Sequence, residues 1–162
     1  MVQEAYVSFE TAKLLKEKGF DEEIETIITP DGRIYYVDEN SVSRVTHTKI
    51  KNSNINIYLE DCSCLTLQMA MKWLREVHNI LIVVDYEWEC DTTPYYFKIY
   101  RLDENGKPKQ VPVKGISYDK DDNPTEHIIG YRDWERSLKD FSSHEEACEA
   151  AIKYCLANLI VK

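Results

Sequence analysis

The sequence has no apolar run of about 18 residues, the length that a membrane-spanning helix needs. No apolar stretch follows Met1 either, so we expect neither a membrane span nor a secretion signal. Glycine and proline are scarce, at five residues each, and no low-complexity linker, repeat or glycine-rich phosphate loop occurs. These absences predict a cytosolic protein with one domain over residues 1–162.

The sequence has five cysteines, and an odd number does not fit a disulfide framework. In a reducing compartment, free thiols are the expected state. Structural zinc sites use cysteine pairs separated by two to four residues, whereas Cys62 and Cys64 form one closer pair. We therefore predict no metal and no cofactor. The five residues are Cys62, Cys64, Cys90, Cys148 and Cys155.

Acidic residues outnumber basic residues, and the formal net charge is −9. Binding to DNA gains affinity from neutralised phosphates, so an acidic chain binds it poorly unless its cations cluster. The densest group is short and comprises Arg44, His47, Lys49 and Lys51. We expect a protein partner rather than a nucleic acid, and we leave the oligomeric state open.

The clearest positive signal runs from Thr66 to Cys90, where the apolar period changes from 3.6 to 2. This change predicts a helix, capped by Ser63 or Thr66, that leads into a strand sharing its core. The helical stripe is Ala70, Trp73, Leu74 and Val77, and the strand's core face is Ile82, Val84, Tyr86, Trp88 and Cys90.

Two further helices are predicted at the ends of the chain. Residues 9–18 follow a capping residue, Ser8, and precede Gly19, which suits a left-handed stop. In the last helix, Ser142 and Glu145 match a capping box. Its apolar stripe comprises Cys148, Ala151, Ile152, Cys155, Leu156 and Leu159.

The remaining strands are predicted in groups between these helices. Residues 25–28 and 33–37 form a hairpin around a Pro-Asp-Gly turn, and residues 54–59 form a third strand, after a polar loop over 38–53. Residues 95–99 are predicted to pair with the strand that follows the central helix. Val111 and Val113 are predicted to form the third strand of this meander. Short connections predict an α+β fold in which an antiparallel sheet packs on about three helices, in the order α-ββ(β)-α-ββ(β)-α.

Residues 115–141 are the least regular part of the pattern. An acidic turn is expected over residues 119–123, whose Asp119 and Asp121 imitate the start of a calcium loop. Pro124 and Gly130 stand where such a loop needs glycine and glutamate, so we interpret the segment as a solvated turn. Ile128, Ile129, Tyr131 and Trp134 predict that the chain then returns to the body.

Three helical stretches carry a family resemblance. They are YVSFETAKLLKEKGF from Tyr6, TLQ and KWLREVHNI between Thr66 and Ile80, and EEACEAAIKYCL from Glu145. Together they resemble small uncharacterised proteins encoded by phages and prophages of gut bacteria. Leu65 stands where those proteins often carry proline before the central helix. The family has no assigned activity, so the resemblance implies a phage or mobile-element accessory protein and no catalytic residues.

Acidic side chains alternate at Asp85, Glu87 and Glu89 and would project from one face of a strand. Paired carboxylates can hold Mg²⁺, so this face supports an alternative function as a metal-dependent hydrolase or nuclease. An outer sheet face exposed to water explains the same pattern.

Four aromatic residues are harder to place inside a core. If Tyr36, Tyr96, Tyr131 and Trp134 gather on one surface, they would anchor a protein partner. We therefore favour a non-enzymatic accessory protein that binds a host or phage macromolecule. A small-molecule-binding domain, with a pocket between helix and sheet, is a further alternative.

Overall fold

The computed structural model describes residues 4–36, 51–55, 60–89, 92–137 and 139–160. The helices are α1 (Phe9–Glu17), α2 (Leu67–His78) and α3 (His144–Asn158), with a 3₁₀ turn, η1 (Asn52–Asn54). The strands are β1 (Thr26–Ile28), β2 (Ile34–Tyr36), β3 (Cys62–Ser63), β4 (Ile80–Tyr86), β5 (Tyr95–Arg101), β6 (Val111–Tyr118), β7 (Pro124–Arg132) and β8 (Glu135–Arg136). The predicted α+β class is confirmed, although five strands rather than two or three separate α2 from α3.

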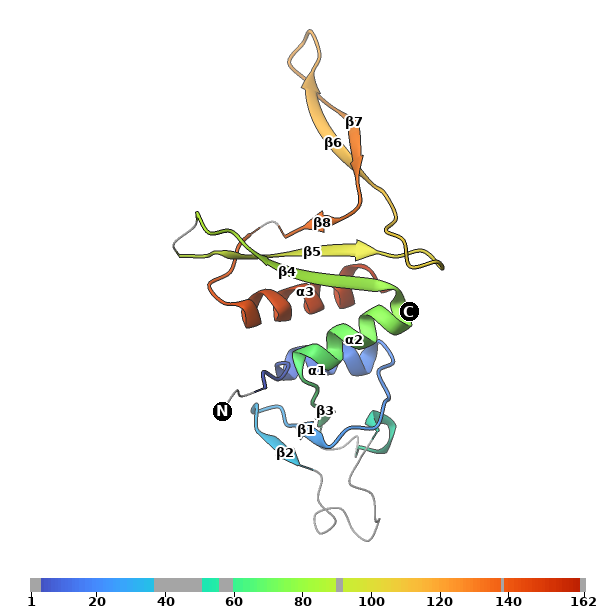
Figure 1. Ribbon diagram of the computed structural model, residues 1–162, viewed down its shortest axis with the longest axis vertical. Helices are drawn as coiled ribbons and strands as arrows, with labels where there is room; N and C mark the ends of the chain where they lie inside the picture. The colour runs from blue at the N-terminus through green and yellow to red at the C-terminus, as the bar shows by residue number, and fades with distance from the viewer. Residues whose placement is uncertain (1–3, 37–50, 56–59, 90–91, 138, 161–162) are drawn as a thin grey trace.

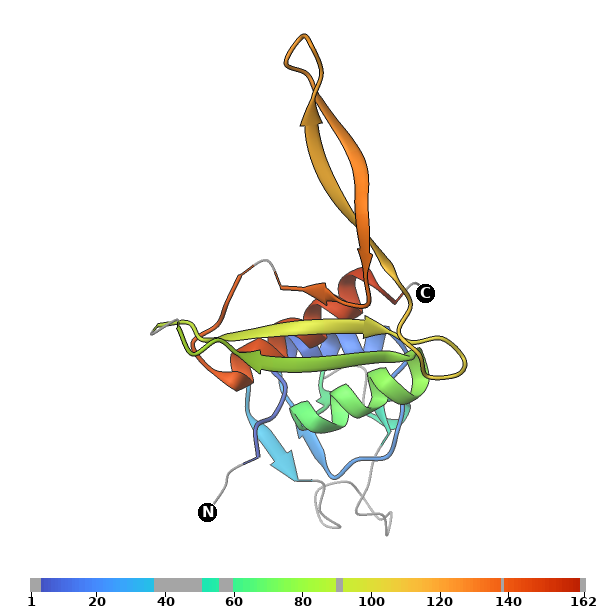
Figure 2. The ribbon, with the colours of Figure 1, turned by 45° about the horizontal axis from the view of Figure 1, so that its top comes forward.

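The three helices lie between two antiparallel sheets (Figure 1). One sheet has the strand order β2-β1-β3 and the other the order β4-β5-β8. Among the described strands, β6 and β7 pair only with each other, and they extend away from this body as a long ribbon, which we call the arm (Figure 2). Burial of helix faces against both sheets explains why so many apolar helix positions are needed.

The ends of α1 and α2 follow the predicted chemistry. The hydroxyl of Ser8 accepts a hydrogen bond from the Thr11 N–H, and Thr66 caps α2 in the same way. Gly19 adopts a φ of 93° just after α1, a conformation that glycine reaches without strain. Asn79 takes the left-handed conformation after α2, so the chain reverses directly into β4.

The start of α3 differs from the prediction by one residue. Ser143, not Ser142, is the cap, and its hydroxyl accepts from the Glu146 N–H. The Glu146 carboxylate reaches back to the Ser142 N–H and hydroxyl, at 3.2 and 2.7 Å. Two overlapping Ser-x-x-Glu patterns are present in the sequence, and packing of the helix selects the second.

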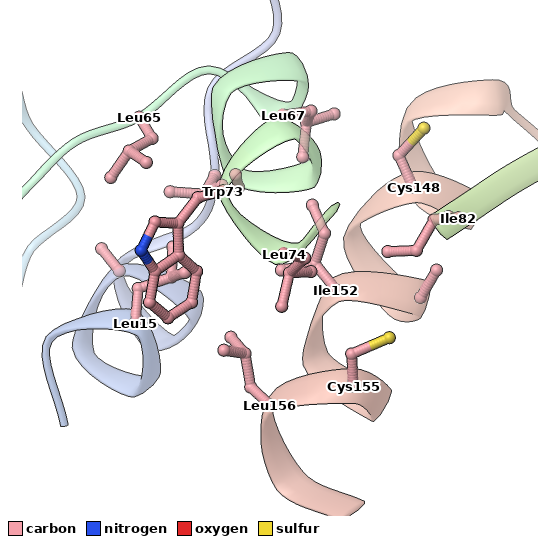
Figure 3. Packing of buried hydrophobic residues seen from close by; sticks show 14 of the residues in the cluster. Leu15, Leu65, Leu67, Trp73, Leu74, Ile82, Cys148, Ile152, Cys155 and Leu156 are labelled. Atoms are coloured by element: carbon pink, nitrogen blue, oxygen red, sulfur yellow. The ribbon is translucent and has the colours of Figure 1, made fainter. Parts of the chain in front are cut away.

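The core is built where the three helices meet (Figure 3). Leu15, Leu74, Ile152 and Leu156 are completely buried there, and the ring of Trp73 meets that of Phe20 edge to face at 5.6 Å. Burial of each such side chain contributes about 2 kcal/mol before entropy is subtracted. The predicted stripe of α3 is confirmed, with Leu159 only partly buried at its end.

A partly exposed polar contact joins α1 to α3. One carboxylate oxygen of Glu149 accepts from the Ser8 N–H at 3.2 Å, from the Ser8 hydroxyl at 2.5 Å and from the Thr11 hydroxyl. The carboxylate therefore lies at the N-terminus of α1, where the helix dipole favours negative charge. Lys153 adds an ion pair to Glu10 at 2.8 Å across the same junction.

Three residues of the predicted core faces are exposed, contrary to the prediction. Val77 is 54% exposed in the last turn of α2, although it shares the apolar stripe with Trp73. Strand β4 ends at Tyr86, so Tyr86 and Trp88 lie at and beyond the edge of the helix layer. Cys90 lies outside the described residues.

Two predicted strand assignments differ from the structure, the first in the residues at its start and the second in its pairing. Asn54 belongs to η1 and Ile55 is a buried bend residue, so no strand begins there; residues 56–59 and most of the loop over 38–53 lie outside the described residues. The third strand of the first sheet is instead β3. In the second sheet, β8 rather than the Val111–Val113 segment pairs with β5.

Candidate functional site

The arm is a two-stranded ribbon whose register follows from a tight acidic turn. At its tip, one carboxylate oxygen of Asp119 accepts from the backbone N–H groups of Asp121 and Asn123, at 2.8 and 2.9 Å. These hydrogen bonds lower the pKa of Asp119. The predicted exposed turn is confirmed, and its carboxylate is used to close the hairpin.

Apolar side chains cover both faces of the arm. Ile116, Tyr118, Ile128 and Tyr131 fall on one face by the pairing register, beside the Lys114–Glu126 ion pair of 2.8 Å. A bulge between Val113 and Lys114 leaves Ile129 on the other face, against Gly115. The five large apolar residues Ile116, Tyr118, Ile128, Ile129 and Tyr131 are 55–68% exposed.

The prediction that the chain returns to the body is confirmed at Trp134, just before β8, but is wrong for Ile128, Ile129 and Tyr131. They lie on β7, which pairs only with β6, so no helix covers them. An isolated hairpin of this kind is marginally stable on its own, and its two outer edges carry unpaired backbone groups. Exposed apolar residues on such an element are typical of a surface that meets a partner.

At the base of the arm, a cluster of cations and aromatic rings covers the outer face of β5 and β8. The Lys98 amine lies 5.3 Å from the Tyr96 ring centroid and 5.1 Å from that of Trp134. The guanidinium carbon of Arg136 lies 4.1 Å from the Tyr96 ring centroid, and that of Arg132 lies 5.4 Å from the Trp134 ring centroid. Each contact contributes about 0.5–1 kcal/mol at a partly exposed site.

The four aromatic candidates do not form a single surface. Tyr96 and Trp134 meet around Lys98, and Tyr131 lies on the arm. Tyr36 lies on β2, across the helices from β5, with its hydroxyl 3.5 Å from that of Tyr6 (Figure 1). The structure thus brings together two of the four predicted residues.

Two of the three acidic candidates, Asp85 and Glu87, are paired with cations. Asp85 accepts from the Lys98 amine at 2.8 Å, and this hydrogen bond, with that from the Tyr86 N–H, lowers the pKa of Asp85. Glu87 pairs with Arg136 at 2.9 Å, while Glu87 and Glu89 both follow the end of β4. Within the described residues, no three acidic, histidine or cysteine side chains form a metal-binding group.

A cysteine–histidine pair that the sequence reading missed lies at the start of α3. The Cys148 sulfur is 3.6 Å from Nδ1 of His144, beside a cavity of about 150 Å³. The spacing of four residues on a helix is the signal that would have found it. Burial raises the pKa of Cys148 to about 11, so the thiol stays protonated at neutral pH and is a poor nucleophile.

We therefore expect the buried thiols to resist modification in the folded protein. Cys62, Cys64, Cys148 and Cys155 are buried and unpaired. In a Cys90→Ser variant, Ellman's reagent should modify less than about one thiol in minutes at pH 7.5, and all four after unfolding in urea. Rapid reaction at Cys148 in the native state, mapped by mass spectrometry, would instead show an accessible nucleophile.

The arm was also missed, although its signals are present in the sequence. Residues 111–118 alternate, a turn follows, and residues 124–132 have strand-forming side chains. Ile128 and Tyr131, three residues apart, break the alternation, because the bulge places them on the same face. An allowance for one bulge would have restored the hairpin pattern.

Comparison with known proteins adds no relative. The chain matches no protein-family model, and no curated protein or solved structure gives a significant match. Among the described helices, none is long and apolar enough to cross a lipid bilayer. The class of protein defined by fold and site is thus an α+β protein with a projecting apolar arm.

Proposed function

We propose that this protein is a non-enzymatic binding protein that engages a protein partner through the β6–β7 arm. The observation that carries the proposal is the exposure of five large apolar residues on an element outside the core. A partner that covers the arm would remove these side chains from water and pair an open strand edge. The resemblance of the three helices supports an accessory role encoded by a phage or mobile element, exercised in a bacterial cytoplasm.

The chemistry of the candidate sites supports binding over catalysis. Asp85 and Glu87 are held in ion pairs with Lys98 and Arg136, and the Cys148 thiol is protonated at neutral pH. The net charge of −9 disfavours binding to phosphates. A protein surface is the remaining partner whose chemistry matches apolar side chains and an open edge.

The arm variant Ile116→Thr/Tyr118→Thr/Ile128→Thr should reduce recovery of a partner at least about tenfold in affinity purification from bacterial lysate. Threonine keeps strand propensity, so the arm should retain its pairing while losing apolar area. The matched control is Val83→Thr/Tyr86→Thr/Trp88→Thr, which removes three apolar side chains exposed elsewhere. Its recovery should equal that of the wild type.

Two results would contradict this function. One is recovery of the wild-type bait alone, and the other is equal recovery with the arm variant. Sedimentation velocity gives an independent check: self-association that the arm variant abolishes would identify the arm as a contact between copies of this chain, and not as a site for a different protein.

A further inference from the structure

A second feature lies beneath the sheet, away from the exposed face of the arm. A cavity of about 370 Å³ opens between β5, β8 and α3, where the sequence suggested a pocket between helix and sheet. This volume is within the range of small-molecule sites. The cavity is lined in part by buried core residues, whereas the apolar residues of the arm lie outside the core.

Aromatic and aliphatic side chains form much of its wall. Phe97 and Phe141 stack with ring centroids 5.9 Å apart, and Tyr154 lies 6.3 Å from Phe97 on the α3 side. Ile99 and Ala150 add aliphatic surface. Walls of this kind fit a flat apolar group, which stacks on or against the rings.

The polar lining is positively charged in an otherwise acidic protein. Arg132, Arg136 and Lys139 line the cavity together with one acid, Glu135, while the guanidinium of Arg136 lies against Tyr96 and pairs with Glu87 and Asp140. Glu135 is already engaged, since it accepts from Arg101 at 2.5 Å and from the Tyr154 hydroxyl at 3.1 Å.

Two of these cations have no carboxylate within ion-pair distance among the described residues. Arg136 pairs with acids at 2.9 and 3.2 Å, whereas Arg132 and Lys139 lie 5.4 and 5.5 Å from the rings of Trp134 and Phe141, and the charge of Lys139 also acts on the carboxylate of Glu146. Cations held in place by rings keep their hydrogen-bond donors available for an anion.

We propose that the cavity between β8 and α3 binds a small molecule with a flat apolar body and one anionic group, such as an aromatic carboxylate. The rings of Phe97, Phe141 and Tyr154 receive the body, and Arg132 and Lys139 face the anion. The site includes Arg132, the last residue of β7, but none of the exposed apolar side chains of the arm, so its test is separate from that of the proposed partner binding.

The probe is 2-naphthoate, compared with its neutral analogue 2-naphthamide by isothermal titration calorimetry. We expect saturable binding of one naphthoate per chain, roughly tenfold tighter than the amide at low salt and weaker as salt rises. The arm variant should bind naphthoate as the wild type does. Equal affinity for the two probes would overturn the assignment of the cations.

Two variants localise the site. Arg132→Gln/Lys139→Gln should weaken naphthoate roughly five- to tenfold and leave the amide unchanged, while the equally charged control Lys107→Gln/Lys120→Gln, in exposed turns, should change neither. Ala150→Leu fills the cavity and should weaken both probes more than about tenfold. Circular dichroism confirms folding of each variant.

Three outcomes would overturn the proposal. They are the absence of saturable naphthoate binding, full binding to Ala150→Leu, and an equal effect of the cavity and control charge pairs. Because the charge variants alter only partly exposed side chains, the test remains decisive even if Ala150→Leu fails to fold.

Discussion

The free energy of unfolding is expected to fall steeply as the pH rises above about 9. Burial raises the pKa of Cys64 and Cys155 to about 12 and that of Cys148 to about 11. In the unfolded chain these thiols ionise near pH 9, so the folded state then holds more protons than the unfolded state. The stability is complete below pH 9 and is lost as the pH rises towards the folded pKa values, at about 1.4 kcal/mol per thiol per pH unit.

The measurement is urea unfolding at pH 7, 9 and 10 for the wild type and Cys155→Ala. The free energy of unfolding of Cys155→Ala should fall less steeply with pH than that of the wild type. The difference in slope should be about the contribution of one thiol, because one titrating group has been removed. Ile152→Val is the matched control, since it removes a buried methyl group without a titratable group and should keep the wild-type slope. Tyrosines that ionise in this range are common to all three proteins and cancel. An equal dependence of the free energy of unfolding on pH for the wild type and Cys155→Ala would contradict the raised pKa of Cys155.

The second large effect is expected at Leu74, where truncation to alanine should cost about 3 kcal/mol of unfolding free energy. Leu74 is completely buried where α2 meets the other helices, so its removal leaves a cavity that the core cannot close (Figure 3). Val77→Ala on the same helix should cost less than about 0.5 kcal/mol, because Val77 is mostly exposed. Urea denaturation with both variants measures the difference.

This pair tests the structure against the sequence pattern. Helical periodicity places Leu74 and Val77 in one stripe, so the pattern alone predicts similar costs. Similar measured costs would mean that the end of α2 is covered in solution. A large difference would support an α2 whose last turn extends past its neighbours.

Local chemistry accounts for what was predictable in the fold. The caps at Ser8 and Thr66 and the left-handed Gly19 depend on residues close in sequence; Ser8 and Gly19 were predicted, and Thr66 was one of two alternatives with Ser63. The stripe of α3 was predicted for the same reason. The cap of α3 was displaced by one residue because Ser142 and Ser143 offer equivalent local hydrogen bonds.

The candidate site depended on contacts that are distant in sequence. Tyr96 and Trp134 were named as binding residues, but their meeting around Lys98 required β8 to pair with β5. Periodicity reports which side chains share a face of a strand, not which strand lies beside it. For the same reason, the acids at Asp85 and Glu87 could be aligned from the sequence while their cation partners could not.

The sequence by itself determined the α+β class, the three helices, most of their ends and the buried stripe of α3, because these follow from backbone hydrogen bonding and apolar period over short distances. Only the tertiary structure decided that β6 and β7 leave the body as an arm, and that β8, α3 and the chain between them enclose a cationic cavity. Strand pairing and helix coverage are choices among distant partners, and their free energy appears only when the whole core assembles.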